Sequence, residues 1–124
     1  MDKRIPEQYA PQWESFTTDG VLYHLTSRDS LEEVRRLGHL EPRDPAPKYW
    51  AGMRAVFMAD PTDPRYEQTL PDVLEHVRSK DEALVRLHIK THNQLWKSND
   101  PKRTFQVMSL EPITAEDIIE VEEL

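Results

Sequence analysis

His24 is the residue whose type and setting most suggest chemistry. It lies within an apolar stretch, and side-chain hydroxyls follow at Thr26 and Ser27. An imidazole can donate or accept a hydrogen bond and can change its protonation near neutral pH, so this pattern can serve in binding or catalysis. The alternative is a half-buried histidine bonded to a neighbouring backbone group, because most isolated histidines are not catalytic.

Other kinds of site find little support in the sequence. His88 and His92 have a spacing that shares one face of a helix, but His88 falls in an expected strand and no third ligand is clear, so we expect no metal. No cysteine and no Gly-x-Ser-x-Gly motif is present, which argues against thiolate and serine-hydrolase chemistry. The three glycines are scattered and make no phosphate-binding loop.

The alternation of apolar and polar residues predicts a strand at 21–26, which places His24 and Thr26 on one face and Tyr23 on the other. A helix at 30–37 follows, with capping candidates in 27–30 and Gly38 as its stop. Further elements are expected from the same signals: strands at 54–59, 83–90, 105–110 and 118–121, a loop at 41–53, turns at 62–69, a helix from Pro71 to Ser79 and a helical turn at 91–97.

The chain of 124 residues fits one domain of the α+β or mixed class. We expect an N-terminal arm at 1–20 whose aromatic side chains pack on a domain at 21–124. The net charge of −7 argues against non-specific binding to DNA. No apolar run is long enough to span a membrane, and the N-terminus does not read as a signal peptide, so a cytoplasmic location is expected.

The segments YHLTS at 23–27 and LEEVRRLGHL at 31–40 together resemble the opening of the ADP-ribosyltransferase superfamily. The resemblance is to its histidine class, which includes the catalytic domains of poly(ADP-ribose) polymerases and toxin ADP-ribosyltransferases. It implies a single small domain with a mixed or antiparallel split sheet and short helices. It further implies that NAD is the cofactor, that His24 holds the NAD ribose and that Thr26 helps to position nicotinamide.

A second segment, VFMAD at 56–60, looks like the family's Tyr-Phe-Ala-Asp strand. The resemblance makes Phe57 a cofactor-binding residue and Tyr66 the aromatic that stacks on nicotinamide, a cationic ring that an aromatic face attracts. The alternatives are a core role for Phe57 and an exposed position at the start of a helix for Tyr66. Arg43 lies in a basic and aromatic loop that could close over NAD or simply pack on its own domain.

A third segment, FQVMSLEPI at 105–113 followed by AEDI at 115–118, resembles the family's late strand with its catalytic glutamate. Gln106 stands at that position. A glutamine can bond a ribose hydroxyl but supplies no negative charge for the oxocarbenium-like transition state, a loss of about 100- to 1000-fold in rate. Glu111 or Asp60 could instead supply the carboxylate. Leu25 is a further departure, because many relatives have glycine there.

The resemblance implies transfer of ADP-ribose from NAD to an acceptor, which could be a protein side chain, a nucleic acid or a small molecule. One alternative is an RNA 2′-phosphotransferase-like enzyme, which would need several basic residues around a phosphate. Another is a non-catalytic binding module on the same fold, because the glutamate is replaced by Gln106.

Overall fold

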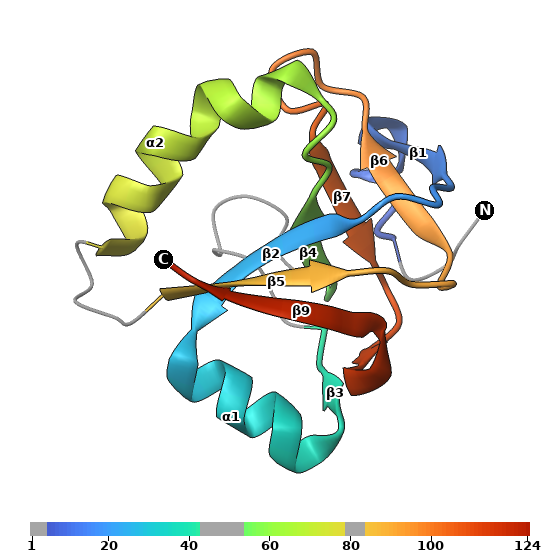
Figure 1. The fold of residues 1–124 in the computed structure, drawn as a ribbon. Helices are drawn as coiled ribbons and strands as arrows, with labels where there is room; N and C mark the ends of the chain where they lie inside the picture. The colour runs from blue at the N-terminus through green and yellow to red at the C-terminus, as the bar shows by residue number, and fades with distance from the viewer. Residues whose placement is uncertain (1–4, 43–53, 79–83) are drawn as a thin grey trace.

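The computed structural model describes residues 5–42, 54–78 and 84–124. Within these ranges the secondary structure consists of two α-helices, two short 3-10 helices and nine strands (Figure 1): η1 (Ala10–Gln12), β1 (Trp13–Phe16), β2 (Leu22–Ser27), α1 (Arg28–Leu37), β3 (His39–Leu40), β4 (Val56–Ala59), α2 (Pro64–Arg78), β5 (Leu84–Ile89), β6 (Leu95–Ser98), β7 (Gln106–Ser109), β8 (Ile113–Thr114), η2 (Ala115–Asp117) and β9 (Ile118–Glu123).

Seven of the strands form one sheet in the order β1-β6-β7-β4-β2-β5-β9, and β3 pairs with β8 in a small second sheet. Every neighbouring pair in the two sheets is antiparallel. A mostly antiparallel sheet with two α-helices confirms the α+β class that the sequence predicts.

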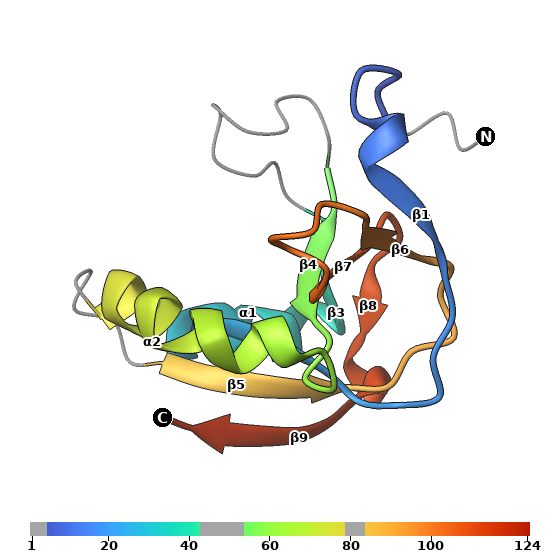
Figure 2. The same cartoon turned by 90° about the horizontal axis from the view of Figure 1, so that it is seen from above.

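The large sheet splits between its two central strands, β2 and β4. These strands share a single partner pair, Tyr23 with Ala59, whereas β2 runs beside β5 from Leu22 to Ser27. Figure 2 shows the consequence: β5 and β9 run across the direction of β4 and β7. The backbones of β2 and β4 therefore diverge on either side of the shared pair, and side chains near His24 face the gap.

The helix α1 begins and ends where its backbone groups find partners. The Ser30 amide donates to the Ser27 side-chain oxygen at 3.1 Å, so Ser27 is the N-cap among the candidates in 27–30. Gly38 ends the helix with φ of 85°, the left-handed conformation that favours glycine. Leu31 and Val34 are buried against the sheet.

Two apolar clusters cover opposite faces of the sheet. Val56 and Met58 belong to the cluster that contains α1, whereas Phe57, between them on β4, packs against the other. That second cluster includes Ile5 and Trp13 from the N-terminal region, where residues 13–16 form the edge strand β1. Successive residues on a strand point to opposite faces, so Phe57 and Met58 pack in different clusters.

The helix expected from Pro71 begins earlier, at Pro64, so the expectation of turns at 62–69 is wrong. Asp63 accepts a hydrogen bond from the Arg65 amide at 2.9 Å, and Pro64 occupies the first helical position, where its missing N–H costs nothing. Pro71 lies inside the helix. The earlier start brings Tyr66 into the first turn of α2.

The helical turn expected at 91–97 is also wrong, because Leu95–Ser98 is strand β6, paired with both β1 and β7. The Thr91 hydroxyl accepts from the Asn93 amide, and the Asn93 side chain donates to Ser109 Oγ at 3.1 Å and to the Pro112 carbonyl at 2.9 Å. Thr91 thus caps a turn between strands instead of a helix.

Candidate functional site

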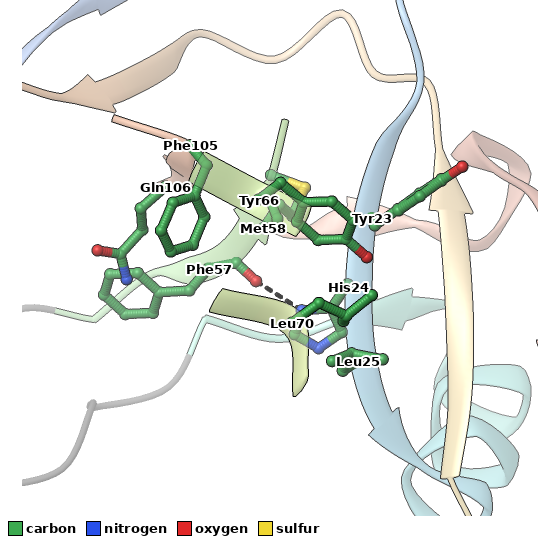
Figure 3. A pocket seen from close by; sticks show the side chains of 10 residues that line it. Tyr23, His24, Leu25, Phe57, Met58, Tyr66, Leu70, Phe105 and Gln106 are labelled. Carbon is green, nitrogen blue, oxygen red and sulfur yellow. Dashed lines mark hydrogen bonds between the residues drawn. The ribbon is translucent and has the colours of Figure 1, made fainter. Parts of the chain in front are cut away.

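A cavity of about 270 Å³ opens where β2 and β4 separate. Its walls come from β2, β4, α2 and the start of β7 (Figure 3), and most of its side chains are aromatic or aliphatic. Apolar walls with a few hydrogen-bonding groups are typical of sites for small organic ligands. The lining residues are Tyr23, His24, Leu25, Phe57, Met58, Ala59, Tyr66, Leu70, Phe105 and Gln106.

His24 spans the split in the sheet. Its Nδ1 lies 2.6 Å from the carbonyl oxygen of Phe57, the hydrogen bond drawn in Figure 3. A carbonyl only accepts, so Nδ1 carries a proton and donates it to this hydrogen bond. The bond joins β2 to β4 beyond their one shared pair and fixes the orientation of the imidazole between them.

The structure brings together four of the six residues that the sequence singled out. His24, Phe57, Tyr66 and Gln106 come from four different elements, and all line this cavity. Thr26 does not line it. Thr26 borders a neighbouring cavity of about 140 Å³, whose lining also includes His24 and Phe57.

Arg43, the remaining predicted cofactor-binding residue, lies outside the described residues, as do Tyr49 and Trp50 of the same expected loop. His24 and Phe57 are common to the two cavities, so they form the partition between Thr26 on one side and the aromatic cavity on the other.

The side-chain amide of Gln106 has an acceptor atom that its surroundings do not satisfy. Its Oε1 is buried and has no hydrogen-bond partner in the described parts of the chain. A buried acceptor without a partner costs about 1–3 kcal/mol of folding free energy. Gln106 lines the cavity, but this oxygen is buried and in Figure 3 points away from the other lining side chains.

The two residues that the sequence offered as alternative carboxylates, Asp60 and Glu111, do not line the cavity. Asp60 has a structural role: its Oδ1 accepts from the Thr62 amide at 3.0 Å and the Thr62 hydroxyl at 2.7 Å, and its Oδ2 lies 3.6 Å from Lys97 Nζ. Among the described residues, the lining of the aromatic cavity holds no Asp or Glu, and Glu41 lines the neighbouring cavity.

Tyr23 and Tyr66 meet edge to face at one wall of the cavity, with ring centroids 5.7 Å apart. Arg86 lies beside both, with its Cζ 4.7 Å from the Tyr23 ring centroid and its Nη1 donating to the Tyr66 hydroxyl at 3.1 Å. Glu122 on β9 accepts from Arg86 Nε at 2.9 Å and from Nη2 at 2.8 Å. His88 Nε2 lies 2.9 Å from the same carboxylate.

These hydrogen bonds shift the pKa values of Glu122 and Arg86. The hydrogen bond from His88, and then that from Arg86, lowers the pKa of the Glu122 carboxyl. Burial lowers the pKa of the Arg86 guanidinium, but the hydrogen bonds to Glu122 and Tyr66 outweigh burial and leave that pKa raised. Arg86 and Glu122 are therefore an ionised pair at neutral pH, and the cation behind the two tyrosines is balanced by a neighbouring anion.

Sequence reasoning missed three kinds of residue at this site. Tyr23 and Phe105 flank His24 and Gln106 in sequence, so their proximity to those two residues was the available signal. Leu70 enters because α2 begins at Pro64. Arg86 contacts the site through pairing of β5 with β2, which no local pattern reveals.

In the described ranges, no three or more His, Cys, Asp or Glu residues gather in a way that could hold a metal ion. Within those ranges, too, neither helix is long and apolar enough to cross a membrane. No protein-family model, curated protein or solved structure matches this chain.

Proposed function

We propose that this protein binds NAD, with the nicotinamide and its ribose in the aromatic cavity, and that it is an ADP-ribosyltransferase-like protein. The observation that carries the proposal is the convergence of His24, Phe57, Tyr66 and Gln106 on one cavity at the split of the sheet. The resemblance of three sequence segments assigns these same residues to an NAD site.

The physical character of the cavity suits a nicotinamide riboside group. Its aromatic walls attract a flat pyridinium cation. His24 and Gln106 add polar side chains to the lining, and imidazole and amide groups can both hydrogen-bond to a ribose hydroxyl. A volume of about 270 Å³ is at the lower end of ligand sites, which suits one ring with its sugar rather than a whole dinucleotide.

Transfer of ADP-ribose requires breaking the bond between nicotinamide and the ribose. The bonding electron pair leaves with the nicotinamide nitrogen, and positive charge develops on the sugar. The lining of the cavity in the described chain offers no carboxylate to stabilise that charge. We therefore propose that the protein binds NAD but cleaves it slowly. The non-catalytic binding module accordingly stays the second candidate function.

The RNA 2′-phosphotransferase alternative has less support. That reaction needs cationic side chains around a phosphate. The described lining of both cavities at the split contains neither Arg nor Lys. Arg86 is engaged by Glu122 and Tyr66 instead of facing a phosphate site.

Thermal unfolding with and without NAD tests the proposal. A ligand at ten times its dissociation constant stabilises the folded state by about 1.4 kcal/mol, which raises the midpoint of a domain of this size by about 5 °C. We expect this shift in the wild type and in His92→Ala, whose exposed histidine lies outside both cavities at the split. We expect no shift in His24→Ala. Equal shifts in all three proteins, or none at millimolar NAD, would contradict the proposal.

A further inference from the structure

The wall formed by Tyr23 and Tyr66 is held from outside the cavity. Tyr23 lies on β2 and Tyr66 in the first turn of α2, and both line the cavity. In Figure 3 the Tyr66 ring lies among the other lining side chains, and the Tyr23 ring extends from β2 away from them. Their edge-to-face contact has an interplanar angle of 66°. The Tyr23 ring also contacts the His88 ring, with centroids 4.6 Å apart, and Tyr66 is buried.

Arg86 adds a contact that the two rings share. It lies on β5, opposite Leu25 of β2, and does not line the cavity. Its guanidinium covers the Tyr23 ring and donates to the Tyr66 hydroxyl at 3.1 Å. One planar group thus fixes a ring from a strand and a ring from a helix.

The guanidinium is itself fixed by Glu122. The carboxylate binds Nε and Nη2 of Arg86 in a two-point arrangement, and His88 holds one of its oxygens. A two-point bond between a guanidinium and a carboxylate restricts rotation as well as position. The Arg86 side chain is 16% exposed and the Glu122 side chain 39% exposed, so the guanidinium is shielded from solvent while the carboxylate is partly open to it.

We propose that Arg86 is a positioning residue for the ligand site, which it pre-forms by holding Tyr23 and Tyr66 in place through the anchor at Glu122. This inference rests on the proposed binding of NAD. The positive charge of Arg86 is balanced by Glu122, so the role of Arg86 is to fix the two rings rather than to attract the ligand. Ordering the rings before the ligand arrives removes an entropic cost from binding.

The test is isothermal titration with NAD on four variants. Arg86→Lys keeps a positive charge but loses the planar two-point bond. Tyr66→Phe keeps the ring and removes only the hydroxyl that Arg86 bonds. The third variant combines both changes. The control, Arg28→Lys, alters an ion pair between α1 and β9, Arg28 with Glu123, that touches no residue of the cavity.

Arg86→Lys and Tyr66→Phe should each weaken NAD binding by about 3- to 10-fold, the cost of ordering one or two side chains. The double variant should bind no more weakly than Arg86→Lys alone, because both changes remove one shared contact. Arg28→Lys should bind as the wild type does. A purely structural role would lower the unfolding midpoint of Arg86→Lys without this non-additive pattern in affinity.

The outcomes separate this inference from the function on which it rests. Wild-type protein that binds no NAD overturns both. Wild-type protein that binds NAD, with Arg86→Lys and Tyr66→Phe binding as tightly, overturns the positioning role alone. An equal loss in Arg28→Lys, or losses that add in the double variant, overturns it as well. If Arg86→Lys does not fold, Tyr66→Phe decides the question, and unchanged affinity in that variant is contrary to the inference.

Discussion

At the scale of single residues, two polar side chains stand out in an otherwise apolar cavity lining. His24 Nδ1 donates a hydrogen bond to the Phe57 carbonyl, which holds the imidazole between β2 and β4. Gln106 lines the same cavity and keeps a buried oxygen without a partner in the described chain.

The proposed function makes a testable prediction at Gln106. Replacing it by glutamate adds a carboxylate where the resemblance places the catalytic one, so Gln106→Glu should raise hydrolysis of NAD by about 100-fold or more. The measurement is release of nicotinamide from NAD. Gln94→Glu, the same change at an exposed site outside the cavity, should leave the rate as it is. A variant that binds NAD and yet releases nicotinamide no faster than the wild type would show that position 106 does not face the reacting carbon.

The residues of the site were partly predictable from the sequence. His24, Phe57, Tyr66 and Gln106 could be named because each lies in a short segment with a family-like pattern. Arg86 could not be named, because the role proposed for it depends on contacts with Tyr23, Tyr66 and Glu122, which lie far from it in the sequence. Local patterns report on neighbours in sequence, and this network exists only in the folded sheet.

At the scale of elements, the segment from β2 through α1 to Gly38 carries the site. β2 contributes three successive residues to the lining of the cavity, Tyr23, His24 and Leu25, because the strand runs along the split. The helix α1 follows β2 directly and is capped at both ends. Gly38 has φ of 85° with nothing near the position of an added Cβ, so only backbone conformation opposes a side chain there.

Gly38→Ala should therefore destabilise the protein by about 1–2 kcal/mol, because an alanine in this conformation is strained. The unfolding midpoint should fall by about 4 to 8 °C. Gly38→Asn should cost less, since asparagine tolerates the left-handed region better. An alanine variant as stable as the wild type would mean that the end of α1 rearranges without cost.

Elements with strong local signals were predicted, and those defined by distant pairing were not. The strands β2, β4, β5, β7 and β9 and the helix α1 follow from alternation, apolar spacing and a terminal glycine. The strand β6 was missed because Thr91 is equally suited to cap a helix or a turn, and pairing with β1 and β7 decides between them. Pro71 suggested a helix start, whereas Asp63 and Pro64 supply the real one.

At the scale of the whole molecule, the ion pair between β5 and β9 couples the stability of the sheet edge to pH. Arg86 and His88 on β5 both hold Glu122 on β9. These bonds lower the pKa of Glu122 in the folded protein below its ordinary value of 4.5. The folded state therefore favours the ionised carboxylate more than the unfolded chain does, and Glu122 stabilises the fold at pH above 4.5.

That contribution should be lost as the pH falls below 4.5 and through the lowered pKa of the folded state. We expect the wild type to unfold at a higher temperature than Glu122→Gln at pH 6, with the difference shrinking as the pH approaches 3. Midpoints of thermal unfolding across this range measure it. A difference that stays constant or grows at low pH would contradict the assignment of this ion pair.

The position of the cavity depends on the arrangement of the whole sheet. The sheet divides at β2 and β4, and the cavity is lined by residues of these two strands, of α2 and of the start of β7. The split is a property of the whole sheet, because it depends on β2 and β4 sharing only one partner pair. No single segment of the sequence could have located the cavity.

The most direct test of the central claim is to map the NAD site by NMR on isotopically labelled protein. We expect NAD to shift the His24 imidazole, the Tyr66 ring and the Gln106 side-chain amide together, with one dissociation constant for all three signals. The signals of His92, on a loop outside both cavities at the split, should stay in place. Shifts confined to other parts of the protein, or none at millimolar NAD, would contradict the account.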